Sequence, residues 1–288
     1  MTFNPLEHPI VFEQPKRVVA TSAWIEHLPF GLLVTDLTRP NTLVELGTHW
    51  GHSYCTFCQA VSALSLPTRC FAVDTWEGDD HAGHYGPEVL ADLRRHHDPL
   101  YATFSTLVQS TFEKALTQFA DGSIDLLHID GRHRYEDAKG DFESYLPKMS
   151  ERGIVLMHDT QVRQSDFGVY KLWEEISAKY PSFEFHHGFG LGVLGVGKNV
   201  PDAIKFLFEA SESERTVLRE FFHCLGAGLH AQNSERLLQA DRELMARLLQ
   251  NERDLVAVHE KRWLNPGAIR SDVFRFLGVR KPNGAGTR

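Results

Sequence analysis

The sequence has few cysteines, no long apolar run and no run of basic residues. Its 4 cysteines among 288 residues form no disulfide framework, so we expect reduced thiols. Without a membrane-length apolar run or a signal-peptide pattern at the N-terminus, we expect a cytoplasmic protein with no membrane span. The net charge of −8, with no basic run, argues against a nucleic acid as the partner.

The remaining composition, 42% hydrophobic and 24% charged, is typical of a globular protein with one large core, or one core and a small appendage. Cys55 and Cys58 could form a redox pair or half of a zinc site. However, no second C-x-x-C accompanies them, and they fall within an expected helix. We therefore interpret them as core thiols that lie one helical turn apart.

Apolar strand patterns alternate with helical patterns along most of the chain. Strands are predicted at 42–46, 69–74, about 104–108, 124–130 and 154–158, and helices at 16–36, from 52 to about 63, shortly after Pro87, and at 111–119, 135–146 and 168–180. Residues 183–187 and 191–196 are typical of a closing antiparallel hairpin. Strands that alternate with helices over five units predict an α/β fold with a doubly wound parallel sheet.

A glycine turn follows the first predicted strand, in the segment TLVELGTHWGHS at 42–53. Gly47 and Gly51 would let backbone N–H groups approach a ligand closely. The segment lacks the dinucleotide fingerprint G-x-G-x-x-G and the phosphate loop G-x-x-x-x-G-K-[ST]. Its pattern, E-x-G-x-x-x-G from Glu45, resembles the first motif of class I S-adenosylmethionine-dependent methyltransferases.

Four reactive side chains follow the fourth and fifth predicted strands. Asp130 and His133 lie just past the fourth strand, and His158 and Asp159 lie at the end of the fifth. Because these strands should be neighbours, their carboxyl ends would bring the four side chains together. Two carboxylates with two imidazoles indicate a divalent-metal site with a general base. An alternative for His133 is a capping role at the following helix.

The wider pattern I-D-G-x-H-x-Y-E…D…P…G-x-x-x-x-H-D resembles a methyltransferase subfamily that includes macrolide-sugar and polysaccharide-cluster O-methyltransferases, with catechol O-methyltransferase as a more distant relative. The resemblance covers about residues 20–197. It implies a seven-stranded, Rossmann-like methyltransferase sheet with a terminal antiparallel hairpin in a domain at 1–200.

The resemblance also implies a cofactor, S-adenosylmethionine, and residues that would hold it. Asp74, at the end of the second strand, would bind the ribose hydroxyls, and Glu45 would face the amino-acid end. The full set of expected cofactor residues is Glu45, Gly47, Thr48, Gly51, Ser53, Asp74, Ser110 and Asp130. The implied metal ligands are Asp130, His158 and Asp159. Since histidine replaces the first carboxylate of the usual acidic pair, the ion could be Mg²⁺ or a softer divalent metal, or none could be needed.

A sugar hydroxyl is a poor nucleophile, because its pKa lies far above neutrality. His133, assisted by Asp130, would remove its proton as the oxygen attacks the methyl group. An insert over the same edge supplies candidate acceptor-binding side chains, although it could also be a surface loop without contacts. These candidates are Trp76, His81, His84 and Tyr85.

Residues 201–288 are predicted to form a helical extension that ends in a disordered tail. Residues 202–224 and 229–262 look helical, and a leucine stripe is interrupted at Asp241 and Asn251. The extension could pack on its own domain, act as a spacer, or join copies into a homo-oligomer.

The sequence therefore predicts an O-methyltransferase that acts on a hydroxyl of a sugar or glycan in polysaccharide biosynthesis, with or without the assistance of a divalent metal. Two alternatives stay open: a non-catalytic cofactor-binding or scaffold module, and a metal-dependent hydrolase that uses the same acidic and histidine residues. A nicotinamide-dependent oxidoreductase is disfavoured because the phosphate fingerprint is missing.

Overall fold

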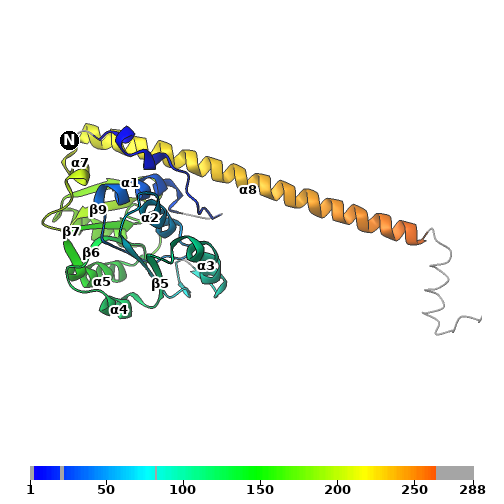
Figure 1. Cartoon of the computed structure of the whole chain (residues 1–288), viewed down its shortest axis with the longest axis horizontal. Helices are drawn as coiled ribbons and strands as arrows, with labels where there is room; N and C mark the ends of the chain where they lie inside the picture. Colours follow the sequence, from blue (N-terminus) through cyan, green and yellow to red (C-terminus); the bar gives the residue numbers. More distant parts are fainter. Residues whose placement is uncertain (1–2, 20–22, 82, 264–288) are drawn as a thin grey trace, which may run out of the picture. The chain divides into compact units, whose positions relative to one another are not determined.

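The computed structural model describes residues 3–19, 23–81 and 83–263, with side chains to 257 (Figure 1). The chain forms two compact units, Met1–Asn233 and Ser234–Arg288. The predicted domain boundary at residue 200 stays a prediction, and the predicted disordered tail lies outside the described residues. Within them, no helix combines the length and the apolar character needed to cross a membrane.

A seven-stranded sheet forms the centre of the first unit, with strand order β5-β2-β1-β6-β7-β9-β8. Its strands are β1 (Thr42–Leu46), β2 (Arg69–Asp74), β5 (Ser105–Gln109), β6 (Ile124–Ile129), β7 (Met149–His158), β8 (Ser182–Phe185) and β9 (Leu191–Gly195). The first five pair in parallel, and β9 runs antiparallel to both β7 and β8. This confirms the predicted doubly wound methyltransferase sheet with its terminal hairpin.

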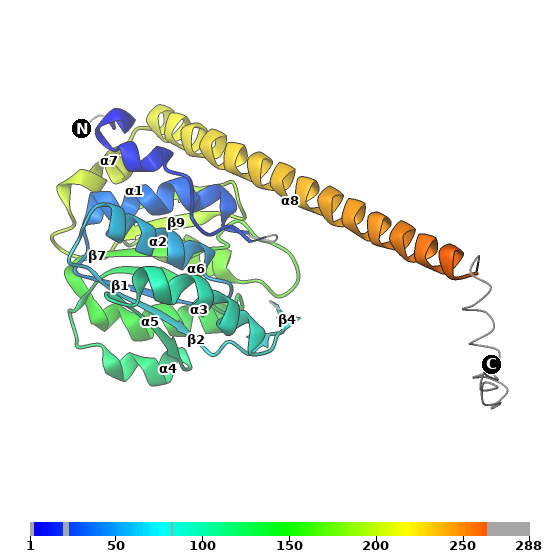
Figure 2. The ribbon, with the colours of Figure 1, turned by 45° about the vertical axis from the view of Figure 1, so that its right-hand side comes forward.

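Helices cover both faces of this sheet (Figure 2). They are α1 (Leu28–Thr38), α2 (His52–Ala63), α3 (Glu88–Tyr101), α4 (Phe112–Ala115), α5 (Tyr135–Tyr145) and α6 (Val169–Ser177). Alternate residues of β1 serve the two faces: Leu43 packs in the cluster that contains α1 and α2, whereas Val44 packs in the cluster that contains α5 and α6. Burial of both faces explains why the strands read as nearly continuous apolar runs.

Two segments differ from the sequence-based expectation in length. A short helix was expected after Pro87, whereas α3 spans 14 residues there. In place of one helix over 16–36, the described residues form a 3₁₀ turn at Ile25–His27 followed by α1. The insert before α3 also carries a two-stranded ribbon of β3 (Gly78–Asp79) and β4 (Gly83–His84).

The C-terminal helices begin inside the first unit. Helix α7 (Lys205–Glu209) and the start of α8 (Glu212–Trp263) contribute Leu207 and Phe222 to the core, both with 0% exposure. Helix α8 is continuous where two helices were expected, and it passes close to the backbone of Glu26 at Gly226. A Cβ at Gly226 would lie 2.2 Å from the Glu26 carbonyl oxygen.

Candidate active site

The glycine turn after β1 locks together the carboxyl ends of three strands. The Gly47 N–H donates to the carbonyl of Val73 at 2.9 Å, and Gly47 has a φ of +88°. A Cβ at this position would lie 2.0 Å from the Asp130 carbonyl oxygen. Glycine is therefore required both by the left-handed backbone and by the close approach of the chain after β6.

Asp74, at the end of β2, organises the same turn. Its Oδ2 accepts hydrogen bonds from the N–H groups of Thr48 (2.9 Å) and His49 (2.8 Å), and its Oδ1 accepts from the N–H of Trp76 (2.7 Å). Each carboxylate oxygen has two lone pairs, so Oδ1 keeps one accepting position for a ligand hydroxyl. The carboxylate predicted to bind ribose thus also shapes the turn beneath it.

A cleft of about 810 Å³ opens at the carboxyl ends of the parallel strands, a volume suited to a cofactor-sized ligand. Most of the predicted site residues line it: Gly47, Thr48, Gly51, Ser53, Asp74, Tyr85, Asp130, His133, His158 and Asp159. Among the described residues, none forms a hydrogen bond with the side-chain oxygen of Thr48, which is buried there. Such a group is available to a polar ligand.

Glu45 is not on the wall of this cleft. Its side chain is fully buried, and its Oε2 accepts a hydrogen bond from Nδ1 of His128 at 2.8 Å. Trp24 donates from Nε1 to Nε2 of the same imidazole at 3.1 Å, which leaves His128 neutral with its proton on Nδ1. Glu45 therefore belongs to a buried chain of hydrogen bonds that reaches Trp24, a residue of the cleft wall.

Four other candidates also lie off the cleft wall. The Trp76 ring is buried at 2% exposure, where Nε1 donates to the carbonyl of His49 at 3.0 Å. Ser110 turns its hydroxyl toward the Thr111 carbonyl, at 3.1 Å. His84 is exposed on β4. His81 lies behind the wall, where its ring contacts those of Phe167 and His133 at centroid distances of 4.7 and 5.3 Å and its backbone N–H donates to Oδ1 of Asp79 at 2.7 Å.

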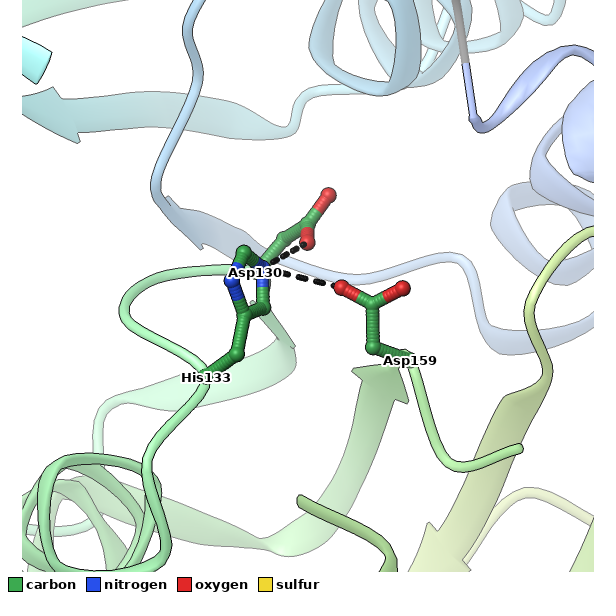
Figure 3. Close-up of side chains that lie close together, drawn as sticks. All are labelled: Asp130, His133 and Asp159. Carbon is green, nitrogen blue, oxygen red and sulfur yellow. Dashed lines mark ion pairs between the residues drawn. The ribbon is translucent and has the colours of Figure 1, made fainter. Parts of the chain in front are cut away.

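Asp130, His133, His158 and Asp159 converge, as predicted from the adjacency of β6 and β7. Nε2 of His133 lies 2.9 Å from Oδ2 of Asp159 and 3.9 Å from Oδ1 of Asp130 (Figure 3). Nδ1 of His158 lies 3.3 Å from Asp130 and 3.4 Å from Asp159. Two carboxylates are thus held between two imidazoles.

The carboxylates and imidazoles of this cluster stabilise one another's charged forms. Burial alone would lower the pKa of His133, but hydrogen bonds and charge from Asp130 and Asp159 raise it to about 9. Burial would raise the pKa of Asp159, yet the charge of His158 and hydrogen bonds from both histidines lower it to about 2. The pKa of His158 is likewise raised well above its usual value by the two carboxylates, against the effect of burial.

A divalent cation would find its ligand atoms in this cluster, but in a different set from the predicted one. Oxygens of Asp130 and Asp159 and a ring nitrogen of His133 lie within 4.8 Å of one another. His158 was predicted as a ligand, whereas its Nε2 donates to the carbonyl of Gly188 at 3.0 Å and its Nδ1 faces the carboxylates. With both nitrogens protonated, His158 acts as a positive partner of the acids.

The sequence-based interpretation missed the ring of Phe167. This ring stacks on His133 with a centroid distance of 4.6 Å and an interplanar angle of 4°. The neighbouring Asp166 accepts from His81 Nε2 at 2.7 Å and from Arg134 Nε at 2.6 Å, which ties this loop to the insert. No periodic pattern marks such a loop, because its contacts come from tertiary structure alone.

The sequence-based interpretation also missed Asp141. It lines the cleft from α5, together with Asp137 one turn earlier. Burial, followed by the charge of Asp137, raises the pKa of Asp141 to about 7. The available signal was the four-residue spacing of these acids on one helix face, directly after the predicted site loop.

Residues 44–160, from β1 through the end of β7, match a family model described as "Methyltransferase domain". The match indicates a methyltransferase domain over these residues. This domain includes the glycine turn, Asp74 and the whole acid–imidazole cluster.

The methyltransferase domain has a relative among curated proteins, the uncharacterized protein y4gI of Sinorhizobium fredii. The two are 48% identical over 195 residues, which cover 68% of this chain and 21% of the relative. The chain thus spans about a fifth of the length of that protein.

Solved methyltransferase structures resemble the domain at low sequence identity. The O-methyltransferase TomG from Streptomyces achromogenes is 13% identical, with 63% of this chain and 83% of TomG covered and a TM-score of 0.46. A methyltransferase from Geobacter sulfurreducens is 16% identical, with 66% and 82% covered and a TM-score of 0.45. The Podospora anserina methyltransferase PaMTH1 is 14% identical, with 67% and 97% covered and a TM-score of 0.44.

Proposed function

We propose that the protein transfers a methyl group from S-adenosylmethionine to a hydroxyl of a sugar or glycan. The observation that carries the proposal is the position of His133. Its Nε2 lies 2.9 Å from a carboxylate oxygen of Asp159, in the cleft that the glycine turn also lines. A proton acceptor and a cofactor-sized space therefore share one cavity.

The cofactor would occupy the part of the cleft near the glycine turn. The first N–H groups of α2, after Gly51, have no partner within the helix and suit the cofactor's carboxylate. The hydroxyl of Thr48 could donate or accept a hydrogen bond with the cofactor's polar groups, and the free position on Oδ1 of Asp74 would accept one from a ribose hydroxyl. The positive charge of the sulfonium group would be stabilised by the carboxylates that line the cleft, such as those of Asp74 and Asp130.

His133 is the group we assign to the hydroxyl proton. The sulfonium methyl is already electrophilic, so the enzyme must mainly position the acceptor oxygen and take up its proton. Because the carboxylates raise the pKa of His133 to about 9, the imidazole must first lose its own proton. Asp159 keeps the ring oriented, and Phe167 holds its face.

A divalent cation fits the donor set of Asp130, His133 and Asp159, which offers two carboxylate oxygens and one imidazole nitrogen. A ring nitrogen that holds the ion cannot also accept the hydroxyl proton, so a bound ion would replace His133 in activating the hydroxyl. When bound, such an ion would lower the pKa of an acceptor hydroxyl. The mixed set suits an ion softer than Mg²⁺, such as Mn²⁺, at least as well as Mg²⁺ itself.

A sugar is the acceptor class that the cleft supports best. Tyr85, which stacks on His49 at 4.6 Å, and Phe167 both line the cleft, so aromatic side chains lie beside the space that a sugar ring would occupy. Asp79, Arg132 and Gln164 line the same cleft and could bind its hydroxyls. The subfamily resemblance points in the same direction, toward polysaccharide assembly.

The first test is calorimetric titration with S-adenosylhomocysteine in EDTA, then in Mg²⁺ and in Mn²⁺. We expect micromolar binding that is lost in Asp74→Ala and kept in His84→Ala, a matched control on the insert but off the cleft. Circular dichroism of Asp74→Ala separates loss of binding from loss of fold. Absence of binding in the folded wild type under all three conditions would overturn the proposal.

The second test is transfer of a labelled methyl group to a panel of sugars, sugar nucleotides and oligosaccharides. Transfer to any of them, abolished in His133→Ala, supports the proposed reaction. Tight cofactor binding without transfer to any hydroxyl acceptor would instead favour a non-catalytic cofactor-binding or scaffold module.

A further inference from the structure

The part of α8 in the second unit presents a long apolar face to solvent. Between residues 234 and 257, eight large apolar side chains have exposed fractions of 37% to 63%. They are Leu237, Leu238, Leu244, Met245, Leu248, Leu249, Leu255 and Val256. A face of this extent on one helix indicates an interaction surface rather than scattered surface residues.

The opposite face of the same segment is polar, and its side chains form hydrogen bonds with one another. Gln239 donates to Glu243 at 3.0 Å, and Gln250 donates to Asp254 at 2.8 Å, each four residues further along the helix. Contacts of this kind are typical of a solvated helix face. The segment is therefore amphipathic, with only its apolar face left to be covered.

The apolar face consists of two adjacent rows, each with steps of four and three residues. The first seam is Leu237, Asp241, Leu244, Leu248, Asn251 and Leu255. The second seam is Leu238, Arg242, Met245, Leu249, Glu252 and Val256. This 3.5-residue repeat is the pattern by which helices pack side by side along their length. Each seam carries two polar residues, at its second and fifth positions.

We propose that α8 pairs in antiparallel orientation with α8 of a second copy of this chain. Around a two-fold axis near residues 246 and 247, Leu237 lies opposite Leu255 of the second copy, and Leu244 lies opposite Leu248. The same register places Asp241 opposite Asn251 of the second copy, where the amide can donate to the carboxylate. Every polar interruption of the first seam thus meets a hydrogen-bonding partner.

The second seam has the same self-complementarity, with charge in place of the amide. In antiparallel register, Leu238 lies opposite Val256, Met245 opposite Leu249, and Arg242 opposite Glu252 of the other copy. A parallel in-register pair would instead place Asp241 against Asp241, Arg242 against Arg242 and Glu252 against Glu252. Like charges facing each other across an apolar seam are costly, so only the antiparallel orientation matches the sequence.

Two adjacent seams on one helix require two neighbouring helices. Four α8 helices that alternate in direction give each helix two antiparallel neighbours, as in a four-helix bundle with dihedral symmetry. The occupant of the face is therefore the same segment of other copies, and the assembly is a tetramer.

Light scattering of the full-length protein at micromolar concentration tests the assembly. We expect a mass about four times the 32.7 kDa of the chain. Arg242→Glu and Glu252→Arg should each raise the dissociation constant more than tenfold, because each places like charges across the second seam. Arg236→Glu, on the polar side of the helix, makes the same charge change and should have no effect. A monomeric or dimeric wild type would overturn the proposal.

Charge exchange tests the orientation independently of folding defects. An equimolar mixture of the Arg242→Glu and Glu252→Arg chains should assemble again, and so should the double variant Arg242→Glu/Glu252→Arg. Failure of both rescues, with the single variants folded, would overturn the antiparallel register.

Disulfide trapping gives a second measure of orientation. In a Cys224→Ser background, which removes the exposed native thiol, a mixture of Leu237→Cys and Leu255→Cys chains should form a mixed disulfide on oxidation. Each variant alone should not cross-link. Efficient cross-linking of Leu237→Cys with itself would show a parallel pair and overturn the proposal.

Discussion

Nε2 of His133 lies 2.9 Å from Oδ2 of Asp159, so the end of β7 orients an imidazole that follows β6. We expect His133→Ala to lower the rate of methyl transfer by about 10² to 10⁴, the usual contribution of a positioned acid or base. The affinity for S-adenosylhomocysteine should stay within about threefold, a free-energy change below about 0.7 kcal/mol. Steady-state kinetics with calorimetry would measure both, and an unchanged rate would contradict the assignment.

The protonation of His133 can be measured without knowing the acceptor. In metal-free protein, an NMR titration should give a pKa of about 9, because Asp130 and Asp159 favour the charged ring despite its burial. Asp159→Asn removes one negative partner and should lower this pKa toward 6.5. Saturating Mg²⁺ should also lower it, since a cation at the two carboxylates opposes the imidazolium. A pKa near 6.5 in the wild type would show that the cluster is not formed in solution.

Gly47 offers a stability test of the glycine turn. Alanine there would place Cβ 2.0 Å from the Asp130 carbonyl and would strain a φ of +88°, so we expect a loss of at least about 3 kcal/mol in the free energy of unfolding. Gly122→Ala is the matched control, because its φ is +69° but no atom lies within 4 Å of the added Cβ. The free energy of unfolding of that variant should fall by only about 1 kcal/mol. Urea unfolding would measure the difference, and equal losses would contradict the close packing at Gly47.

The strands and their convergence could be predicted because they depend on local pattern and sheet adjacency. β1 and β2 have the predicted ends, since buried parallel strands form apolar runs that stop at polar or glycine residues. The meeting of Asp130 with Asp159 followed from placing β6 beside β7. Neither inference required knowledge of side-chain packing.

The direction of individual side chains could not be predicted in the same way. Strand alternation separates Glu45 from Val44 and Leu46, but only the packing of Trp24 and Phe57 against His128 decides that Glu45 faces the core. The stacking of Phe167 on His133 depends on a loop that returns from β7 over the cleft. Such contacts arise from tertiary structure, on which the periodicity of a sequence gives no information.

Asp141 makes the stability of the folded protein depend on pH. Burial and the charge of Asp137 raise its pKa to about 7, above the ordinary value of 3.8, so the folded state binds a proton that the unfolded state releases. The wild type should therefore lose stability as the pH rises from about 4 to 7, and Asp141→Asn should remove this loss. When the pH is raised from 5 to 8, the free energy of unfolding of the variant should increase relative to that of the wild type by about 2 to 3 kcal/mol. This value follows from 1.36 kcal/mol per unit of difference between the folded and unfolded pKa values.

Thermal or urea unfolding at the two pH values would measure this gain. Glu143→Gln is the matched control, because Glu143 lies exposed on the same helix and loses the same charge. Its stability relative to the wild type should change little with pH. If the relative stability of Asp141→Asn were also independent of pH, the pKa of Asp141 would not be raised in the folded protein, and the cleft wall at α5 would be more hydrated than its burial indicates.

A gain confined to Asp141→Asn would instead establish a carboxyl group that changes charge near neutral pH inside the cleft. Ligand binding at this wall would then also depend on pH, because any group placed beside Asp141 would meet a neutral acid below pH 7 and a carboxylate above it.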